Sequence, residues 1–163
     1  MDAIVAVYAD WGIGAGGTQP IALNADRKFF RRMTQGACVV VGRKTLADFP
    51  GGKPLPNRVN LVLTRQELEV EGALVVHSPE EALEAARAHD KVMVIGGASV
   101  YRQMLPLCQR VYVTKLSAQP ASDVFFPNLD QDPDWVCAGA VEEGGTEDGV
   151  SYQFLLYCRR DSL

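Results

Sequence analysis

A carboxylate stands on the apolar side of a predicted helix near the N-terminus. In the segment LNADRKFFRRM, Asp26 lies three and four positions before Phe29 and Phe30, so a helix places all three on one face. At the edge of an apolar pocket, such a carboxylate could form strong charge-assisted hydrogen bonds to a polar ligand. The acid could also serve only the helix, because Asn24 is a suitable N-cap and the helix dipole favours an acid in the first turn by roughly 0.3–1 kcal/mol. Asp26 alone therefore leaves both roles open.

Three predicted strands end in residues that suit phosphate groups. One strand ends at Gly42 and is followed by two cations and a hydroxyl at the start of a helix (Arg43–Thr45). Gly96 and Gly97 separate another strand from a helix, where a ligand can approach the backbone closely. Arg65, after a third strand, could hold a phosphate monoester such as the one that distinguishes NADP from NAD. Each junction alone could be an ordinary turn, but three at one sheet edge indicate an extended, multiply phosphorylated nucleotide.

A Pro/Gly-rich loop, FPGGKPLPNRVN, carries two apolar residues, Phe49 and Leu55, and one cation, Arg58, just before a predicted strand. Arg58 could be an ordinary surface residue. It could also bind a substrate carboxylate, because a guanidinium pairs with a carboxylate through two parallel hydrogen bonds. The loop is therefore a second candidate for contact with a substrate.

The elements that must position these residues alternate between apolar strands and helices. We expect strands at 3–9, 37–42, 59–64, 73–76, 91–97 and 110–118, and helices at 25–35, 78–88 and 98–105. The segment 135–160 is typical of an antiparallel hairpin with a turn rich in Gly and Asp. Apolar strands separated by helices predict an open, mainly parallel α/β sheet, which binds ligands at the carboxyl ends of its strands.

The composition restricts the class of protein. The chain has 163 residues, 47% of them hydrophobic and 22% charged, and we expect one domain spanning 1–163. A formal charge of −4 disfavours a general nucleic-acid binder, and we expect no signal peptide and no membrane-spanning segment. The four cysteines form no C-x-x-C pair and are expected to be buried thiols in a reducing cytosol, and the two histidines do not form a cluster that would bind zinc.

The order and spacing of the motifs resemble those of the dihydrofolate reductase family. The matching motifs are A-x-x-x-x-x-GIG, P-x-x-x-x-x-D-x-x-x-F, GRKT, PLPNR, LTR, IGGASVY, YVTKLSA, DVFFP and SYQFLLYCRR, and they cover nearly the whole chain. The resemblance implies about eight strands with a C-terminal antiparallel hairpin, about four helices, and NADPH as cofactor. It implies hydride transfer to C6 of 7,8-dihydrofolate and protonation of N5. It also implies a cytoplasmic monomer that binds antifolate inhibitors such as trimethoprim.

The resemblance also implies roles for individual residues. Asp26 matches the acid that binds the pterin's 2-amino group and N3, Thr114 a hydroxyl that bonds this acid, and Arg58 the residue that holds the glutamate α-carboxylate. The substrate-binding residues so implied are Ile4, Ala6, Asp26, Arg27, Phe30, Phe49, Leu55, Arg58, Ile95 and Thr114. The cofactor-binding residues so implied are Ala6, Ile13, Gly14, Gly42, Arg43, Lys44, Thr45, Leu63, Thr64, Arg65, Ile95, Gly96, Gly97, Ala98, Ser99, Val100 and Tyr101. A cis peptide bond between Gly96 and Gly97 is implied as well.

Three positions depart from the family pattern. Ile21 stands where many bacterial relatives have a tryptophan that orders a water near the acid, so the resemblance leaves the proton route open here. Gln19 stands where a methionine is common, at the tip of the loop that closes over the nicotinamide. Arg27 replaces a usually apolar residue that contacts the aminobenzoyl ring, and it predicts altered sensitivity to diaminopyrimidine inhibitors.

Two other functions are compatible with parts of this pattern. NADPH-dependent reductases of riboflavin synthesis act on a ribosyl sugar attached to a pyrimidine, but they lack the pairing of an acid and an arginine seen in Asp26 and Arg58. A non-catalytic NADPH-binding module is the second alternative, in which the departures at Ile21 and Arg27 have ended turnover. This module would bind NADPH without consuming dihydrofolate.

Overall fold

The computed structural model describes residues 1–162, which form two compact units. The terminal unit consists of residues 2–30 and 108–162, and the central unit consists of residues 31–107 together with Met1. Each unit contributes four strands of the main sheet and is described by itself below. No helix in residues 1–162 combines the length and apolar character needed to cross a membrane.

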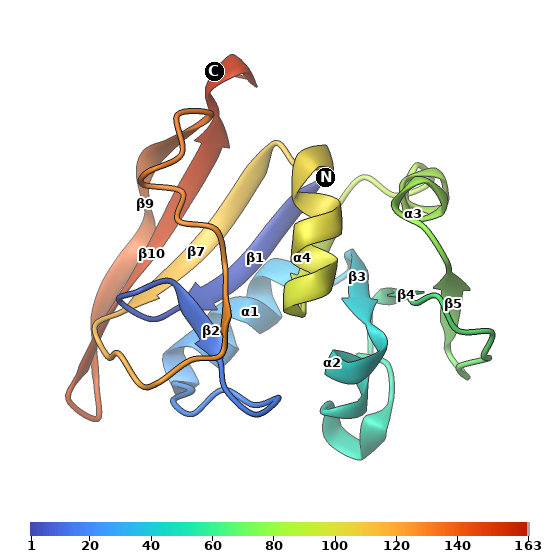
Figure 1. The fold of residues 1–163 in the computed structure, drawn as a ribbon, viewed down its shortest axis with the longest axis horizontal. Helices are drawn as coiled ribbons and strands as arrows, with labels where there is room; N and C mark the ends of the chain where they lie inside the picture. Colours follow the sequence, from blue (N-terminus) through green and yellow to red (C-terminus); the bar gives the residue numbers. More distant parts are fainter. Residues whose placement is uncertain (163) are drawn as a thin grey trace. The chain divides into compact units, whose positions relative to one another are not determined.

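The terminal unit is built on four neighbouring strands, which Figure 1 shows side by side. In spatial order they are β1 (Asp2–Val7), β7 (Arg110–Leu116), β10 (Val150–Arg159) and β9 (Trp135–Glu147). Strand β1 pairs with β7 in parallel, whereas β10 runs antiparallel to both β7 and β9. A separate two-stranded sheet pairs β2 (Gly12–Gly14) with β8 (Val124–Phe125), and helix α1 (Asn24–Thr34) begins in this unit.

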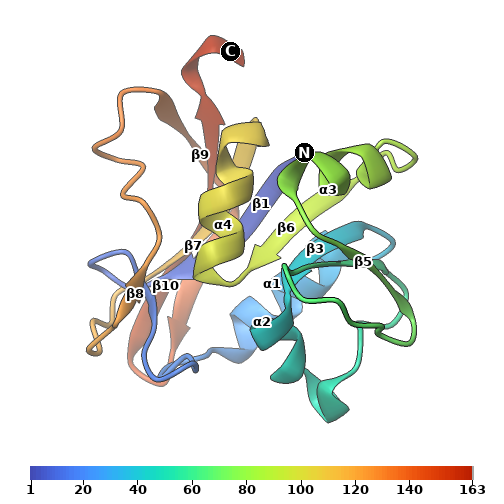
Figure 2. The same ribbon diagram turned by 45° about the vertical axis from the view of Figure 1, so that its right-hand side comes forward.

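The central unit has four parallel strands and three helices. The strands, in spatial order, are β5 (Ala73–Val76), β4 (Val59–Leu63), β3 (Cys38–Gly42) and β6 (Val92–Gly96). The helices are α2 (Arg43–Ala47), α3 (Pro79–Ala86) and α4 (Ala98–Met104), and Figure 2 shows α2 directly after β3 and α3 after β5. In β3 the residues Val39–Val41 are fully buried, as expected for a parallel strand covered on both faces. Short 3₁₀ turns occur at Pro50–Gly52 and Leu105–Leu107, with a third at Arg160–Ser162 in the terminal unit.

The start of α3 follows the sequence prediction. Ser78 caps this helix, because its hydroxyl accepts a hydrogen bond of 3.1 Å from the backbone N–H of Glu81. Pro79 occupies the first helical position, where its missing N–H costs nothing. Local capping signals were therefore sufficient to place this helix.

The C-terminal hairpin differs from the sequence prediction. Strand β9 continues through the glycine-rich segment to Glu147, and the turn consists only of Asp148 and Gly149, whose φ angles are 51° and 78°. Two positive φ angles are typical of a type I′ hairpin turn. The glycines predicted a turn, but in the structure they allow the two strands to pair closely. A Cβ atom at Gly144 would collide with the backbone oxygen of Tyr152.

Two further sequence expectations need correction. The sequence did not predict that β2 pairs with β8. Strand β2 has three residues and β8 has two, and segments this short cannot show a periodic pattern. Of the four free cysteines, Cys38, Cys108 and Cys158 are buried as expected, whereas Cys137 is exposed. Cys137 lies on β9, which is the last strand of its sheet and leaves many side chains in solvent.

Candidate active site

Helix α1 presents the predicted face to the sheet of the terminal unit. Phe29 is buried and its ring stacks on that of Phe154 in β10, with 4.3 Å between the ring centroids. Asp26, one turn earlier on the same face, lies in the first turn of the helix and is half-buried. The helical spacing of the sequence therefore places the acid against the sheet.

The sheet below the helix carries a row of side chains from three strands. Ala6 of β1 lies opposite Thr114 of β7, and Thr114 lies opposite Phe154 of β10. Residues paired in register point to the same face of a sheet, and Ile4, two residues before Ala6, shares that face. The structure thus brings together Ile4, Ala6, Asp26 and Thr114, four of the predicted substrate-binding residues.

Asp26 and Thr114 form an unusual pair. Burial raises the pKa of Asp26 above its ordinary value, while the nearby Thr114 hydroxyl and the positive charge of Arg27 partly oppose this rise. The Thr114 hydroxyl is completely buried and, apart from its interaction with Asp26, makes no hydrogen bond to any group within residues 1–162. One hydroxyl satisfies only part of the accepting capacity of a carboxylate, so this arrangement suits a ligand that donates further hydrogen bonds to Asp26.

The raised pKa gives a testable effect on stability. We expect Asp26→Asn to raise the free energy of unfolding at neutral pH, because the folded protein binds the Asp26 proton more tightly than the unfolded chain does. Ionisation therefore costs the folded state stability above the raised pKa, and the cost vanishes below the ordinary value of 3.8, where both states are protonated. Urea unfolding of wild type and variant, at neutral and acidic pH, measures the difference.

The matched control for this stability experiment is Asp134→Asn, which alters an exposed carboxyl on the loop before β9. The gain from Asp26→Asn should shrink as the pH falls, whereas the control should show no such gain. A difference between Asp26→Asn and wild type that stays constant with pH would contradict the assignment of a raised pKa to Asp26.

The start of α1 does not follow the predicted capping. Asn24 is the first helical residue, and its side-chain oxygen accepts a 3.2 Å hydrogen bond from Nη1 of Arg27 instead of capping the helix. The backbone N–H groups of Asn24 and Ala25 instead donate to the carboxylate of Glu147, at 2.7 and 3.0 Å. Sequence reasoning missed Glu147 because more than 120 residues separate it from the helix.

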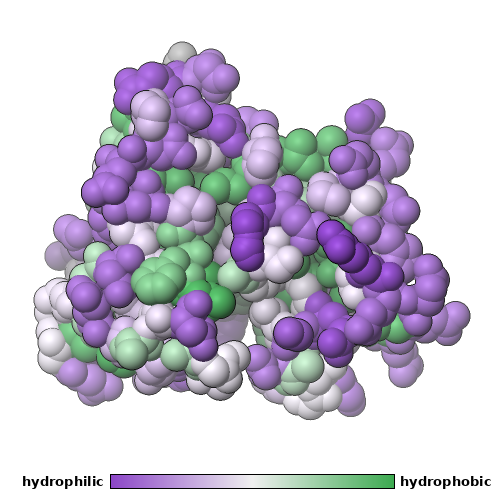
Figure 3. Space-filling model, viewed as in Figure 1, coloured by the Kyte–Doolittle hydropathy of each residue, from purple (hydrophilic) through white to green (hydrophobic). Residues whose placement is uncertain are grey.

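The loop after β1 is held by the segment around β8. Gly14 of β2 accepts a 2.9 Å hydrogen bond from the backbone N–H of Asp123, and the Asp123 carboxylate accepts one of 2.9 Å from Gly16. Ile13 in this loop is half-buried, and Gln19 is exposed. Figure 3 shows apolar surface over β2 and β8, where Val124 and Phe125 are 39% and 52% exposed.

In the central unit, Arg58 is held by two hydrogen bonds. Its Nε donates to the hydroxyl of Thr34 at 3.0 Å, and its Nη1 donates to the carbonyl of Pro56 at 2.7 Å. Burial lowers the pKa of Arg58, and the positive charge of Arg31 adds to this effect. A partly desolvated guanidinium fixed in this way is prepared to receive a carboxylate.

A buried asparagine that the sequence did not single out shapes the loop around Arg58. Asn60 of β4 is 2% exposed, and its side chain exchanges hydrogen bonds of 3.0 Å with the N–H and C=O of Leu55. Its amide also donates to the carbonyl of Arg58 at 3.2 Å. The signal was present in the sequence, because an asparagine within the apolar strand VNLVL must find partners when buried.

The three phosphate-suited junctions meet at one edge of the central unit's sheet. Gly42 is paired with Leu63, and Val41 with Gly96, so β3, β4 and β6 end side by side. A Cβ atom at Gly97 would lie 2.9 Å from the hydroxyl oxygen of Thr45, so only glycine leaves this hydroxyl uncrowded. The Gly96–Gly97 peptide bond is cis, as the resemblance implies.

The remaining predicted residues of the central unit surround these junctions. Ala98, Ser99, Val100 and Tyr101 form the first turn of α4, and Ile95 is buried at the end of β6. Arg43, Lys44 and Arg65 are exposed cations, and Phe49 and Leu55 are half-buried. The structure therefore gathers all predicted cofactor residues of this unit at or next to one sheet edge.

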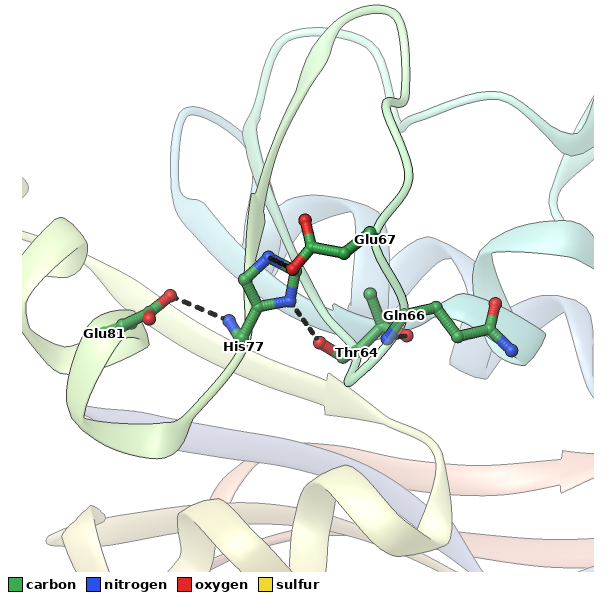
Figure 4. A network of polar contacts seen from close by, with 5 residues as sticks. All are labelled: Thr64, Gln66, Glu67, His77 and Glu81. Carbon is green, nitrogen blue, oxygen red and sulfur yellow. Dashed lines mark hydrogen bonds and ion pairs between the residues drawn. The ribbon is translucent and has the colours of Figure 1, made fainter.

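The turn after β4 is fixed by the polar contacts shown in Figure 4. The carbonyl of Thr64 accepts a 2.8 Å hydrogen bond from Nδ1 of His77, and the hydroxyl of Thr64 accepts one of 3.2 Å from the N–H of Gln66. The N–H of His77 donates to Glu81 at 2.9 Å. These contacts hold the turn from which Arg65 projects. Within residues 1–162, no three His, Cys, Asp or Glu side chains are grouped to bind a metal ion.

Comparisons with known proteins agree with this arrangement. A sequence model of a family described as dihydrofolate reductase matches residues 1–159. Dihydrofolate reductase of Haemophilus influenzae is 39% identical over 96% of this chain and 97% of its own, and that of Bacillus subtilis 34% identical over 98% and 94%. A structure described as Enterococcus faecalis dihydrofolate reductase complexed with NADP(H) and RAB-propyl is 34% identical, has a TM-score of 0.86, and covers 98% of this chain and 96% of its own. The predicted fold, an open, mainly parallel sheet of eight strands with C-terminal antiparallel strands and four helices, is confirmed.

Proposed function

Because the chain belongs to the dihydrofolate reductase family, we propose that its NADPH-dependent reduction of 7,8-dihydrofolate to 5,6,7,8-tetrahydrofolate depends on Asp26 as the residue that binds the pterin. One observation carries this assignment. A half-buried carboxyl with a raised pKa lies next to Thr114, whose buried hydroxyl has no other partner within residues 1–162. Such a pair suits a ligand that presents several N–H donors, as the 2-amino group and N3 of a pterin do.

The role of Asp26 in proton transfer is electrostatic. Its carboxylate accepts hydrogen bonds from the pterin's 2-amino group and N3, and its charge favours the protonated form of the ring. The Thr114 hydroxyl donates to the carboxylate and keeps it oriented. The N5 proton then comes from water, because the acid is occupied at the other side of the pterin ring. Ile21 stands in place of the tryptophan that orders this water in many relatives, so the water here lacks that hydrogen-bonding partner.

The central unit fits a pyrophosphate-containing cofactor. A side chain at Gly42 would crowd Val100, and one at Gly97 would crowd the Thr45 hydroxyl, so glycine keeps both groups in place. Arg43–Thr45 supply charge and a hydroxyl at the start of α2. Leu63–Arg65 and Ile95–Tyr101 complete the proposed NADPH-binding set in this unit, and Ala6, Ile13 and Gly14 are its proposed members in the terminal unit. NADPH supplies the hydride that C6 receives when it is bound. Arg65, on the turn fixed by His77, is proposed to bind the 2′-phosphate.

Arg58 is proposed to bind the α-carboxylate of the substrate's glutamate. Its two hydrogen bonds to Thr34 and Pro56 fix the guanidinium before any ligand arrives, which reduces the entropy lost on binding. Phe49, Leu55 and Phe30 are proposed to contact the apolar part of the substrate. We further propose that the chain acts in the cytoplasm as a monomer, and that its two units together form one functional domain.

Arg27 is expected to weaken diaminopyrimidine inhibitors. These inhibitors bind a carboxylate as cations, and the positive charge of Arg27 already acts on Asp26. Arg27→Leu should therefore lower the inhibition constant of trimethoprim several-fold, since it removes the charge and adds apolar contact. The measurement is the inhibition constant at saturating NADPH, with Arg27→Lys as the control that keeps the charge. Equal constants in wild type and in the leucine variant would contradict the prediction.

The proposed function is tested by following the absorbance of NADPH with and without 7,8-dihydrofolate, from acidic to alkaline pH. We expect oxidation that requires dihydrofolate and declines at alkaline pH, with an apparent pKa above the ordinary carboxyl range. Binding of NADPH without consumption of dihydrofolate at any pH would contradict the proposal and favour a non-catalytic binding module. Oxidation that depends on a ribosylated pyrimidine instead would favour the riboflavin-pathway alternative.

A further inference from the structure

The first turn of α1 depends on a residue from the other end of the chain. The first N–H groups of a helix have no partner within the helix and need acceptors from elsewhere. The side chain of Leu23, directly before the helix, has no hydrogen-bond acceptor, and the side-chain oxygen of Asn24 already accepts from Arg27. The carboxylate of Glu147 accepts a hydrogen bond from each of the first two N–H groups. Oε2 accepts from Asn24 at 2.7 Å, and Oε1 accepts from Ala25 at 3.0 Å. Both bonds are charge-assisted, and the helix dipole adds to them.

Glu147 is itself held in a defined place. It is the last residue of β9, is paired with Val150 of β10, and precedes the two-residue turn of the hairpin. Val150 and Tyr152 pack against a buried apolar cluster that contains Leu23, the residue before the helix. The hairpin end and the chain entering α1 are therefore joined by apolar packing as well as by the carboxylate.

The same hairpin also holds the helix one turn later. Phe29 stacks on Phe154 of β10. Asp26 therefore lies between two residues that contact the hairpin: Ala25, which is bound to Glu147 of β9, and Phe29. Asp26 directly follows Ala25, whose N–H Glu147 holds. A shift of the helix start would move Asp26 relative to Thr114 on β7, which pairs with β10.

We propose that Glu147 is a positioning residue for the reaction: by binding the N–H groups of Asn24 and Ala25, it fixes Asp26 beside Thr114. This inference rests on the proposed function of Asp26. Displacements of about 1 Å at a reacting centre can cost as much as a hundredfold in rate, so loss of the carboxylate should be measurable. Glu147 itself does not touch the substrate in this proposal.

The test compares Glu147→Ala and Glu147→Gln with Glu143→Gln, which alters an exposed acid on the same strand. We expect Glu147→Ala to slow single-turnover hydride transfer on the order of tenfold while the KM for NADPH stays near wild type. Glu147→Gln should be intermediate, because its amide oxygen can still accept one hydrogen bond. Glu143→Gln should behave as wild type.

The amide proton resonances of Asn24 and Ala25 give a second readout that does not depend on turnover. Both should lie downfield in wild type and move upfield in the two Glu147 variants but not in Glu143→Gln. Wild-type rates in Glu147→Ala, or unchanged resonances in Glu147→Gln, would overturn the proposal. Failure of the wild-type enzyme to reduce dihydrofolate would instead overturn the proposed function, and the resonances would still decide whether Glu147 caps the helix.

Discussion

Replacing Asp26 with asparagine is expected to lower the turnover of 7,8-dihydrofolate at neutral pH by at least about 100-fold, while NADPH still binds. The 2-amino group and N3 of the pterin present N–H donors, and a carboxylate can accept from both. An asparagine has one acceptor oxygen and must direct its NH₂ group at the second donor. The variant also loses the negative charge that favours the protonated ring. Single-turnover measurements of hydride transfer, with NADPH binding followed by fluorescence, separate the two effects.

The control for this experiment is again Asp134→Asn, which removes an exposed carboxyl from the same unit and should turn over as wild type. The decline of rate at alkaline pH should also change in Asp26→Asn, because the group whose pKa is raised by burial is gone. Turnover of the asparagine variant near the wild-type rate would remove Asp26 from the mechanism.

Replacing Arg58 with alanine is expected to raise the KM for dihydrofolate on the order of ten- to a hundredfold, with little change in NADPH affinity. Hydrogen bonds to a charged group contribute roughly 1.5–3 kcal/mol, and Arg58 is fixed and partly desolvated before it binds. Because the carboxylate that it holds is remote from the reacting atoms, the loss should affect KM more than kcat. Steady-state kinetics with each substrate varied in turn measures this split.

Arg65→Ala is the matched control for Arg58→Ala, because it removes an arginine from the same unit at the proposed 2′-phosphate site. It should show the opposite pattern, with weakened NADPH binding and a nearly unchanged KM for dihydrofolate. If Arg58→Ala weakened NADPH instead, Arg58 would belong to the cofactor site.

The elements that the sequence predicted well are those defined by local patterns. Apolar runs predicted β3, β4 and β6, and the pattern Ser78-Pro79-Glu80 predicted the start of α3, because each signal lies within one element. The end of β9 was misplaced because its glycines serve close pairing with Tyr152, a partner that is distant until the hairpin forms. Glycine permits a turn and a close approach equally well, and only the partner strand decides between them.

The candidate site shows the same division. The helical spacing of Asp26 with Phe29 placed the acid on the correct face, and the strand ends placed the phosphate-suited junctions at one edge. The predicted capping of α1 by Asn24 was wrong, because the Asn24 side chain accepts a hydrogen bond from Arg27 and the first N–H groups of the helix donate to Glu147. The interaction of Glu147 with residues more than 120 positions away leaves no local pattern, so its role could not be read from the sequence. Asn60 binds Leu55 and Arg58, which are near it in the chain, and its place in an apolar strand was a signal that was not used.

The division of the chain between the two units has a consequence for its synthesis. Apart from Met1, the central unit is one continuous segment that ends at Leu107, whereas the terminal unit joins residues 2–30 to those from Cys108 onward. Thr114, Phe154 and Glu147, the residues that surround Asp26 and its helix, all belong to the later segment. A ribosome that has reached Leu107 has thus made every strand of the central unit but none of these neighbours. These neighbours of the acid are therefore translated only after the whole central unit, and a message cut short before Thr114 yields an Asp26 without any of the three.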